Sequence, residues 1–183
     1  MLTFLDISGA IFGFLATYCF IRVNLLGWPL SLIAICLDIV LCLKSGIYGN
    51  MVLQFIYFFI SIYGWYQWKL GKTQQSLGIR DITKIEAISL FAIAIGGFVA
   101  IFTLLKLTDS QIPYLDTSIV VISLLAQWLA CKKIIQTWWL WLIADAILVG
   151  LYAYKNIPVH VVLFVIYTGM AVAGYFNWRK LKV

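Results

Sequence analysis

The side chains best suited to binding a ligand lie in one apolar stretch, residues 137–154. One broad face of a helix with about 3.6 residues per turn would carry Trp138, Trp141, Asp145 and Tyr152. Aromatic rings stack on flat ligands and attract cations, and a carboxyl group beside them adds negative charge. The pattern predicts a site for a flat ligand that is cationic or rich in hydroxyls, with Asp145 as its first candidate.

A second group of polar side chains follows a helical spacing of three and four residues. Its members are Asn50, Gln54, Tyr57, Ser61 and Trp65. Their amides and hydroxyls suit the hydroxyl groups of a sugar. Two more polar side chains, Gln127 and Asp38, come from other apolar stretches. We expect these groups to converge on one cavity.

Structural roles compete with ligand binding for some of these residues, because amides join helices and Trp and Tyr gather at membrane interfaces. The interfacial role is favoured for Trp28 and Trp68, which lie near the ends of apolar stretches. Asp38 has an alternative partner in Lys44, and His160 is expected at the interface. A role in ligand binding is favoured for the side chains that lie deeper in the membrane, which are Gln54, Gln127, Trp141 and Asp145.

The composition indicates that helices in a membrane position these groups. The chain has 183 residues, of which 64% are hydrophobic and 11% charged, against roughly 45–50% and about 25% in soluble domains. This excludes a water-soluble or disordered chain. Strands are not expected, and the apolar stretches predict seven spans at about 4–21, 25–43, 49–68, 87–105, 117–131, 137–154 and 158–178.

An internal repeat predicts the architecture. The stretch 5–69 matches 115–179 without a gap, with identical pairs that include Trp28 and Trp138, Tyr57 and Tyr167, Gly64 and Gly174, and Trp68 and Trp178. The sequence predicts an all-α membrane protein with a first three-helix repeat in 1–69, a loop and linker helix in 70–114, and a second repeat in 115–183. Parallel repeats with a site on their shared axis are typical of transporters.

The distribution of basic residues predicts the orientation. Ten Lys and Arg residues fall on the predicted C-terminal side of the membrane, and the other side has only Lys44, Lys106 and Lys155. Positive charge stays in the cytoplasm, so we expect a cytoplasmic C-terminus and an external N-terminus. The net charge of +6 is then explained by topology and lipid contact, and no nucleic-acid partner is expected.

Two local patterns predict details of the helices. Thr83 and Glu86 have the spacing of a capping box, which would start the fourth helix. Gly9 and Gly13 form a small-xxx-small pair, which favours close packing of the first helix against a neighbour.

Catalytic, cofactor and metal motifs are not found in the sequence. A membrane enzyme would have to draw its acid and base from Asp38, Asp145 and His160, which are scattered. The alternatives to a transporter are therefore such an enzyme and a structural subunit that packs against other membrane proteins.

With these patterns together, the chain resembles the PnuC family of bacterial vitamin transporters, best known for nicotinamide riboside. One motif is Gln54 followed by the run from Ile62 to Trp68. The other begins at Lys132-Lys133 and continues through Trp138, Trp141, Asp145, Tyr154-Lys155, Gly174-Tyr175 and Trp178-Arg179-Lys180.

The resemblance implies a 3+1+3 fold like an enlarged SWEET transporter, in the bacterial inner membrane. It further implies facilitated diffusion, trapping of the vitamin by a cytosolic kinase, and a homo-oligomer, suggested by relatives to be a trimer. The implied pocket consists of Gln54, Tyr57, Ser61, Gln127, Trp138, Trp141 and Asp145.

Two positions depart from the pattern expected for nicotinamide riboside. Asp145 stands where some members have Asn, and Ser61 stands where Asn can occur. Relatives carry thiamine or riboflavin, and an acid in the pocket favours a permanent cation, which nicotinamide riboside and thiamine are and riboflavin is not. Nicotinamide riboside is the leading candidate, with thiamine as the alternative.

Overall fold

The computed structural model describes residues 2–45, 48–73, 78–106, 113–154, 156 and 158–182. Each predicted span is a helix, and these are α1 (Leu2–Ile21), α2 (Gly27–Ser45), α3 (Tyr48–Thr73), α4 (Lys84–Leu105), α5 (Pro113–Cys131), α6 (Thr137–Tyr154) and α7 (Pro158–Leu181). Within the described residues, all but α3 are long and apolar enough to cross a membrane. The polar side chains along α3 explain this exception.

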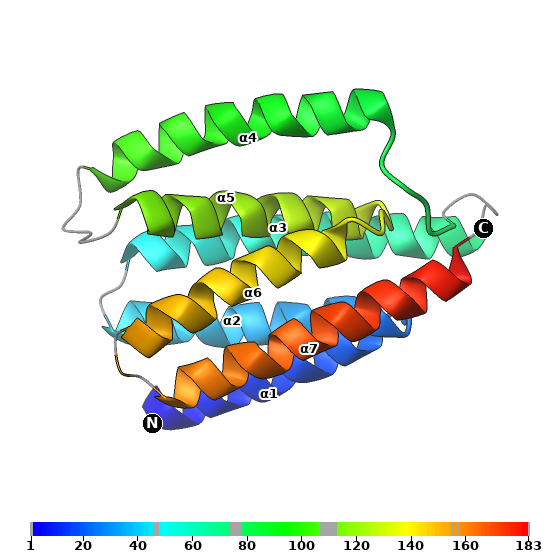
Figure 1. The fold of residues 1–183 in the computed structure, drawn as a ribbon. Coiled ribbons are helices and arrows are strands. Elements are labelled where there is room, and N and C mark those ends of the chain that lie inside the picture. Colours follow the sequence, from blue (N-terminus) through cyan, green and yellow to red (C-terminus); the bar gives the residue numbers. More distant parts are fainter. Residues whose placement is uncertain are drawn as a thin grey trace.

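The helices form a bundle in which neighbours in sequence pack together, except for α3 and α4. Helix α1 packs on α2 and α2 on α3, and in the same way α5 packs on α6 and α6 on α7. Contacts of α3 with α5 and of α1 with α7 join these two groups. Among the described residues, α4 contacts only α5 and stands at the edge of the bundle (Figure 1). The two termini lie at opposite ends of the bundle.

Equivalent positions in the two matching stretches form the same hydrogen bonds across the bundle. The indole Nε1 of Trp68 on α3 donates to the backbone oxygen of Ala130 on α5, at 3.0 Å. The indole Nε1 of Trp178 on α7 donates to the backbone oxygen of Phe20 on α1, at 2.9 Å. Each of these bonds therefore ties the third helix of one group to the first helix of the other.

Two Trp–Gly contacts are repeated in the same way. A Cβ atom added to Gly64 would lie 2.2 Å from the ring of Trp28, and one added to Gly174 would lie 2.5 Å from the ring of Trp138. A Cβ at either position would overlap the ring, which explains why both pairs are identical in the sequence. The predicted close packing at Gly9 and Gly13 is also confirmed, because added Cβ atoms there would meet other helices at 2.9 and 3.0 Å.

The turns that follow α1 and α5 have the same backbone. Val23 and Lys133 both adopt a left-handed conformation, with φ of 54° and 51°, which is uncommon for residues other than glycine. Each amide donates to a carbonyl three residues earlier, Val23 to Phe20 and Lys133 to Ala130. The sequence match therefore extends to the local chain path.

Four tryptophans form a continuous row near the end of the bundle that holds the C-terminus. In this tryptophan row Trp28 and Trp68 have ring centroids 5.5 Å apart, Trp68 and Trp178 are 6.1 Å apart, and Trp178 and Trp138 are 5.4 Å apart. The prediction that Trp28 and Trp68 lie in an interfacial belt is wrong, because their exposed fractions are 0% and 2%. They pack against other helices, and nearness to a helix end does not distinguish these two environments.

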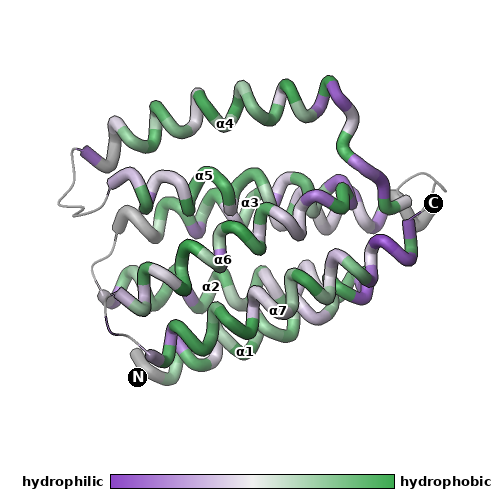
Figure 2. Tube along the Cα trace, in the orientation of Figure 1, coloured by the Kyte–Doolittle hydropathy of each residue, from purple (hydrophilic) through white to green (hydrophobic). Residues whose placement is uncertain are grey.

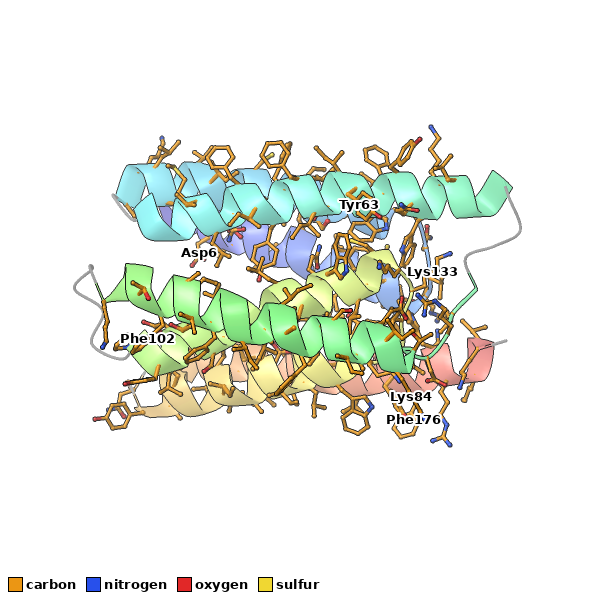
Figure 3. All side chains as sticks on the ribbon, turned by 90° about the horizontal axis from the view of Figure 1, so that it is seen from above. Asp6, Tyr63, Lys84, Phe102, Lys133 and Phe176 are labelled. Carbon is orange, nitrogen blue, oxygen red and sulfur yellow. The ribbon has the colours of Figure 1, made fainter. Side chains whose placement is uncertain are left out.

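A short extended segment closes the same end of the bundle. In this strap, residues 78–83, the amide of Arg80 donates to the carbonyl of Lys133, and the amide of Ile135 donates to the carbonyl of Arg80. The strap is thereby held on the turn between α5 and α6. Figure 3 places Lys133 and the first residue of α4, Lys84, at this end.

Side chains of the strap connect it to α7 and α4. Asp81 accepts hydrogen bonds from Lys182 and Gln136, and the bond from Lys182, with the weaker one from Gln136, holds the pKa of Asp81 below its ordinary range. The predicted capping box is confirmed: Thr83 Oγ1 donates to Glu86 Oε2 at 2.9 Å and accepts from the Glu86 amide at 3.3 Å. Helix α4 therefore begins where the sequence predicted.

Polar residues gather at the end with the C-terminus (Figure 2). Helix ends and turns place there the basic residues Arg22, Lys69, Arg80, Lys84, Lys132, Lys133, Arg179, Lys180 and Lys182. The opposite end has Lys44 and Lys106, while Lys155 lies outside the described residues. The charge asymmetry on which the predicted orientation rests is thus present in the fold.

Candidate functional site

The bundle contains a partly open cavity of about 480 Å³ between helices α1, α2, α3, α5, α6 and α7. Helix α4 contributes no lining residue in the described part of the chain. Six of the seven predicted site residues line this cavity, namely Gln54, Tyr57, Gln127, Trp138, Trp141 and Asp145. The predicted convergence of amide, acidic and aromatic side chains is therefore present in the structure.

Asp145 reaches this cavity from the middle of α6 and is 7% exposed. None of the described residues forms a hydrogen bond or an ion pair with its carboxyl group. No Lys, Arg or His is among the described residues that line the cavity. A buried carboxylate is costly without a counter-charge, so the site is suited to a positively charged ligand.

Ser61 is the predicted site residue that does not line the cavity. It is fully buried behind the cavity wall, where its Oγ accepts a hydrogen bond of 3.1 Å from Nε2 of Gln127. Because this bond occupies one amide hydrogen, the carbonyl oxygen of Gln127 remains as an acceptor. Ser61 thus orients Gln127 and does not itself face a ligand.

Asp38, which the sequence left undecided between ligand and Lys44, also lines the cavity. Its Oδ2 accepts a hydrogen bond of 3.3 Å from Nε2 of Gln54, on the next helix. The two acids therefore differ, because Asp38 has an amide donor and Asp145 has none among the described residues. Gly9 makes this arrangement possible, since a Cβ there would lie 2.9 Å from Oδ1 of Asp38.

Two tyrosines at equivalent positions face the cavity from α3 and α7. The side chain of Tyr57 is hydrogen-bonded to that of Ser123 on α5. The hydroxyl of Tyr167 lies beside Gly13 on α1, 3.0 Å from where a Cβ would stand. Gly13 and Ser123 are equivalent positions of the two matching stretches. Tyr57 therefore has a serine hydroxyl beside it, whereas Tyr167 has a glycine.

The tryptophan row forms one end of the cavity, where Trp138 and Trp178 are lining residues. The Nε1 atoms of Trp28 and Trp138 are buried and have no hydrogen-bond partner among the described residues. In Trp138 this donor is enclosed in the packing of the cavity wall. Trp141 adds a second aromatic surface one helical turn further along α6.

Several lining residues were not singled out from the sequence, among them Thr17, Ser31 and Tyr167. Each is the counterpart of a predicted site residue in the other matching stretch, since Thr17 corresponds to Gln127, Ser31 to Trp141 and Tyr167 to Tyr57. The repeat itself was therefore the signal that could have found them.

Other residues of the predicted faces lie elsewhere. Trp65 is 38% exposed, and Tyr152 stacks on His160 with ring centroids 4.7 Å apart. The side chain of Asn50 lies outside the described part of the structure.

Only some of the acid and base groups that an enzyme would draw on lie in the cavity. Of the three scattered candidates, Asp38 and Asp145 line the cavity and His160 does not. Within the described residues there is no group of three His, Cys, Asp or Glu side chains that could hold a metal ion. The described lining offers two carboxyl groups, two amides, several hydroxyl groups and aromatic faces, a set that can bind a polar ligand.

Comparison with known proteins gives a consistent family. The model of the nicotinamide mononucleotide transporter family matches residues 3–180. Among curated proteins, the riboflavin/roseoflavin transporter RibM of Streptomyces davaonensis is 26% identical, over 94% of this chain and 83% of its own. The nicotinamide riboside transporter PnuC of Escherichia coli is 22% identical, over 97% of this chain and 85% of its own.

A solved structure has the same fold. A crystal structure of the vitamin B3 transporter PnuC superposes with a TM-score of 0.78 at 23% sequence identity, covering 98% of this chain and 82% of that one. The nicotinamide riboside transporter PnuC of Neisseria mucosa is 28% identical over 74% of this chain and 56% of its own length.

Proposed function

The chain belongs to the nicotinamide mononucleotide transporter family, which includes the PnuC vitamin transporters, and on this premise we propose that it takes up nicotinamide riboside by facilitated diffusion. The observation that carries the choice of cargo is the buried carboxyl group of Asp145, which has no partner among the described residues, in a cavity whose described lining has no basic side chain. Nicotinamide riboside has a permanent positive charge on its pyridinium ring. A neutral vitamin would leave the acid without compensation.

The lining residues suggest how the cargo binds. The pyridinium ring stacks on Trp138 or Trp141, where it also meets the negative π face. The carboxylate of Asp145 offsets the positive charge. The ribose hydroxyls donate to and accept from the amides of Gln54 and Gln127, which Asp38 and Ser61 hold in place from behind. The proposed binding residues, with Ser61 acting through Gln127, are Gln54, Tyr57, Ser61, Gln127, Trp138, Trp141 and Asp145.

The architecture that fits this role is a 3+1+3 arrangement with a first repeat in 1–69, a linker in 70–114 and a second repeat in 115–183. The paired hydrogen bonds and Trp–Gly contacts at equivalent positions of the two repeats support it. Alternating access then comes from rocking of the two repeats around the cavity. With seven crossings of the bacterial inner membrane, the N-terminus lies outside the cell and the basic C-terminal end lies in the cytoplasm. The basic residues at that end contact anionic lipids of the membrane.

Facilitated diffusion accumulates nothing by itself, so uptake depends on a cytosolic kinase that phosphorylates the vitamin after entry. A phosphate group prevents return through a cavity whose titratable lining groups are acidic or phenolic in the described part of the chain. We place the working protein in a homo-oligomer, a trimer, as the family resemblance implies.

Thiamine is the second candidate, because its thiazolium ring is also a flat permanent cation that suits Asp145. Riboflavin, which the relative RibM is named for, is neutral and fits the acid less well. The three vitamins therefore make a direct comparison.

The test is ligand binding to the purified protein, followed by quenching of tryptophan fluorescence. We expect nicotinamide riboside to bind most tightly. Asp145→Asn, which keeps the size of the side chain, should weaken binding by at least about thirtyfold, because breaking a buried charge pair costs about 2–5 kcal/mol. Asp81→Asn is the matched control, since Asp81 is exposed on the strap and does not line the cavity.

Unchanged binding in Asp145→Asn would remove Asp145 from the site. Tight binding of thiamine alone would keep the cavity and change the cargo. Tight binding of riboflavin alone would refute the charge argument.

A further inference from the structure

We propose that the groove between α4 and α5 binds one molecule of an anionic phospholipid, whose acyl chain lies in the groove and whose phosphate group pairs with Lys106. This site lies outside the cavity, and its occupation does not depend on the identity of the cargo. It assigns a ligand to α4, which contributes no described residue to the cavity lining.

The α4–α5 groove has a volume of about 330 Å³. Its described lining residues are Ala94, Ile95, Phe98 and Val99 from α4, with Ser118, Val121 and Ile122 from α5. The one hydroxyl group among them, on Ser118, donates to the carbonyl oxygen of Tyr114 on its own helix, at 2.8 Å. The described lining therefore leaves no side-chain donor for a polar ligand, and it suits a hydrocarbon chain.

Helix α4 has little protein around it. Among the described residues it contacts only α5, and none of the residues 84–103 that can span the membrane is buried. Ile95 and Val99 line the groove and are nevertheless 53% and 60% exposed. Figure 1 shows α4 at the edge of the bundle. The groove is therefore open to the hydrocarbon of the bilayer along its length.

A ridge of side chains runs along α4 from the groove to the end of the helix. Residues four apart lie on the same face of a helix, and this ridge consists of Ala94, Phe98, Phe102 and Lys106. The rings of Phe98 and Phe102 stack with centroids 5.9 Å apart. The Nζ atom of Lys106 lies 4.8 Å from the centroid of Phe102. Lys106 thus places a positive charge at the end of an apolar surface.

Helix α5 begins at the same end of the groove. The ring of Tyr114, near the start of α5, packs on Phe102 with centroids 4.4 Å apart. Figure 3 places Phe102 at the end of the bundle opposite to Lys84. Tyrosine and lysine are typical of the interface between membrane and water, so this end of the groove lies at the level of lipid headgroups.

The dimensions and the charge fit a lipid of one leaflet. Ala94 and Lys106 are twelve residues apart, about 18 Å along an α-helix, and the hydrocarbon of one leaflet is about 15 Å thick. An acyl chain on the ridge therefore brings its phosphate group to Lys106. Within the described residues Lys106 forms no ion pair. A headgroup with its own ammonium group would place a second positive charge there, which favours an anionic lipid.

The experiment is native mass spectrometry of the full-length protein, stripped of lipid in detergent and titrated with phosphatidylglycerol or phosphatidylcholine. We expect the first phosphatidylglycerol to bind more tightly than later ones. It should also bind about fivefold more tightly than phosphatidylcholine, the effect of one lysine near a membrane surface. Equal binding of the two lipids, or the lack of a first tight site, would overturn the proposal.

Two lysine variants test the headgroup. Lys106→Gln should weaken binding of the first phosphatidylglycerol by about fivefold. Lys44→Gln is the matched control, because Lys44 is at the same end of the bundle and does not border the groove. Equal losses in the two variants would reveal only a general attraction to surface charge and would refute the site.

Two alanine variants test the acyl chain. Ala94→Phe places a ring in the groove and should abolish the tight site, whereas Ala92→Phe alters an exposed position of α4 outside the groove and should retain it. Thermal unfolding in detergent shows whether both variants fold, and Lys106→Gln still tests the site if Ala94→Phe does not. A tight site retained in folded Ala94→Phe would overturn the placement. An oligomer that Ala94→Phe dissociates, with no lipid on the wild-type protein, would assign the groove to a second copy of the chain and refute the lipid.

Discussion

The contact between Gly174 and Trp138 makes a sharp prediction about the cavity wall. In Gly174→Ala the new Cβ would lie 2.5 Å from the indole ring, whereas carbon atoms in contact prefer about 3.5–4.0 Å. The ring must therefore withdraw by about 1 Å. Overpacking of this kind costs about 1–3 kcal/mol, and the better helix propensity of Ala returns about 1 kcal/mol. We expect a net loss of about 0–2 kcal/mol in stability.

The same substitution should weaken cargo binding, because Trp138 lines the cavity. Loss of good ring stacking corresponds to about 0.5–1.5 kcal/mol, or up to roughly a tenfold increase in Kd. Gly64→Ala is the matched control: its Cβ would lie 2.2 Å from Trp28, a ring of the tryptophan row that is not among the lining residues. Gly64→Ala should lower the free energy of unfolding by a similar amount and leave the Kd within about twofold of the wild-type value.

The assay combines thermal unfolding in detergent with the fluorescence titration. Gly169→Ala on the same helix α7 meets no atom within 4 Å, so it should raise stability by about 1 kcal/mol and leave binding unchanged. If Gly174→Ala and Gly64→Ala gave the same Kd, the reasoning that Trp138 forms the binding wall would be refuted.

Three further predictions concern single contacts. Ser61→Ala should raise the Kd a few-fold, because it leaves the amide of Gln127 without its acceptor at a cost of about 1 kcal/mol; an unchanged Kd would contradict the positioning role. Trp178→Phe removes the hydrogen bond to Phe20 and part of the ring, so we expect the free energy of unfolding to fall by about 1–3 kcal/mol. An unchanged melting temperature would contradict this. Thr83→Ala should lower stability by about 1 kcal/mol through loss of the cap of α4 without affecting binding; weaker binding would show that the strap acts on the cavity.

Much of the site was predictable because polar side chains on membrane helices avoid the lipid and face the interior of the bundle. The spacing within α3 and α6 correctly placed Gln54, Tyr57 and Asp145 on faces that meet. Periodicity describes one helix at a time, however. It could not reveal that Asp38 pairs with an amide on the next helix, or that Ser61 lies behind the wall.

The error at Trp28 and Trp68 has a different cause. Both residues lie near helix ends, where an interfacial belt and a helix–helix contact have the same local sequence. The distinguishing information was in the repeat, since Gly64 and Gly174 recur in the two copies together with their tryptophans. A glycine that recurs with a large ring at a constant separation indicates that the ring packs on it.

The crossed hydrogen bonds of Trp68 and Trp178 also bear on how the protein is synthesised. Trp68 needs α5, and Trp178 closes onto α1, the first of these helices to leave the ribosome. Helix α1 can pack on α2 at once, but its contact with α7 forms only when almost all of this sequence has been translated. A nascent chain that stops before α7 therefore lacks the contact that joins α1 to the second group of helices.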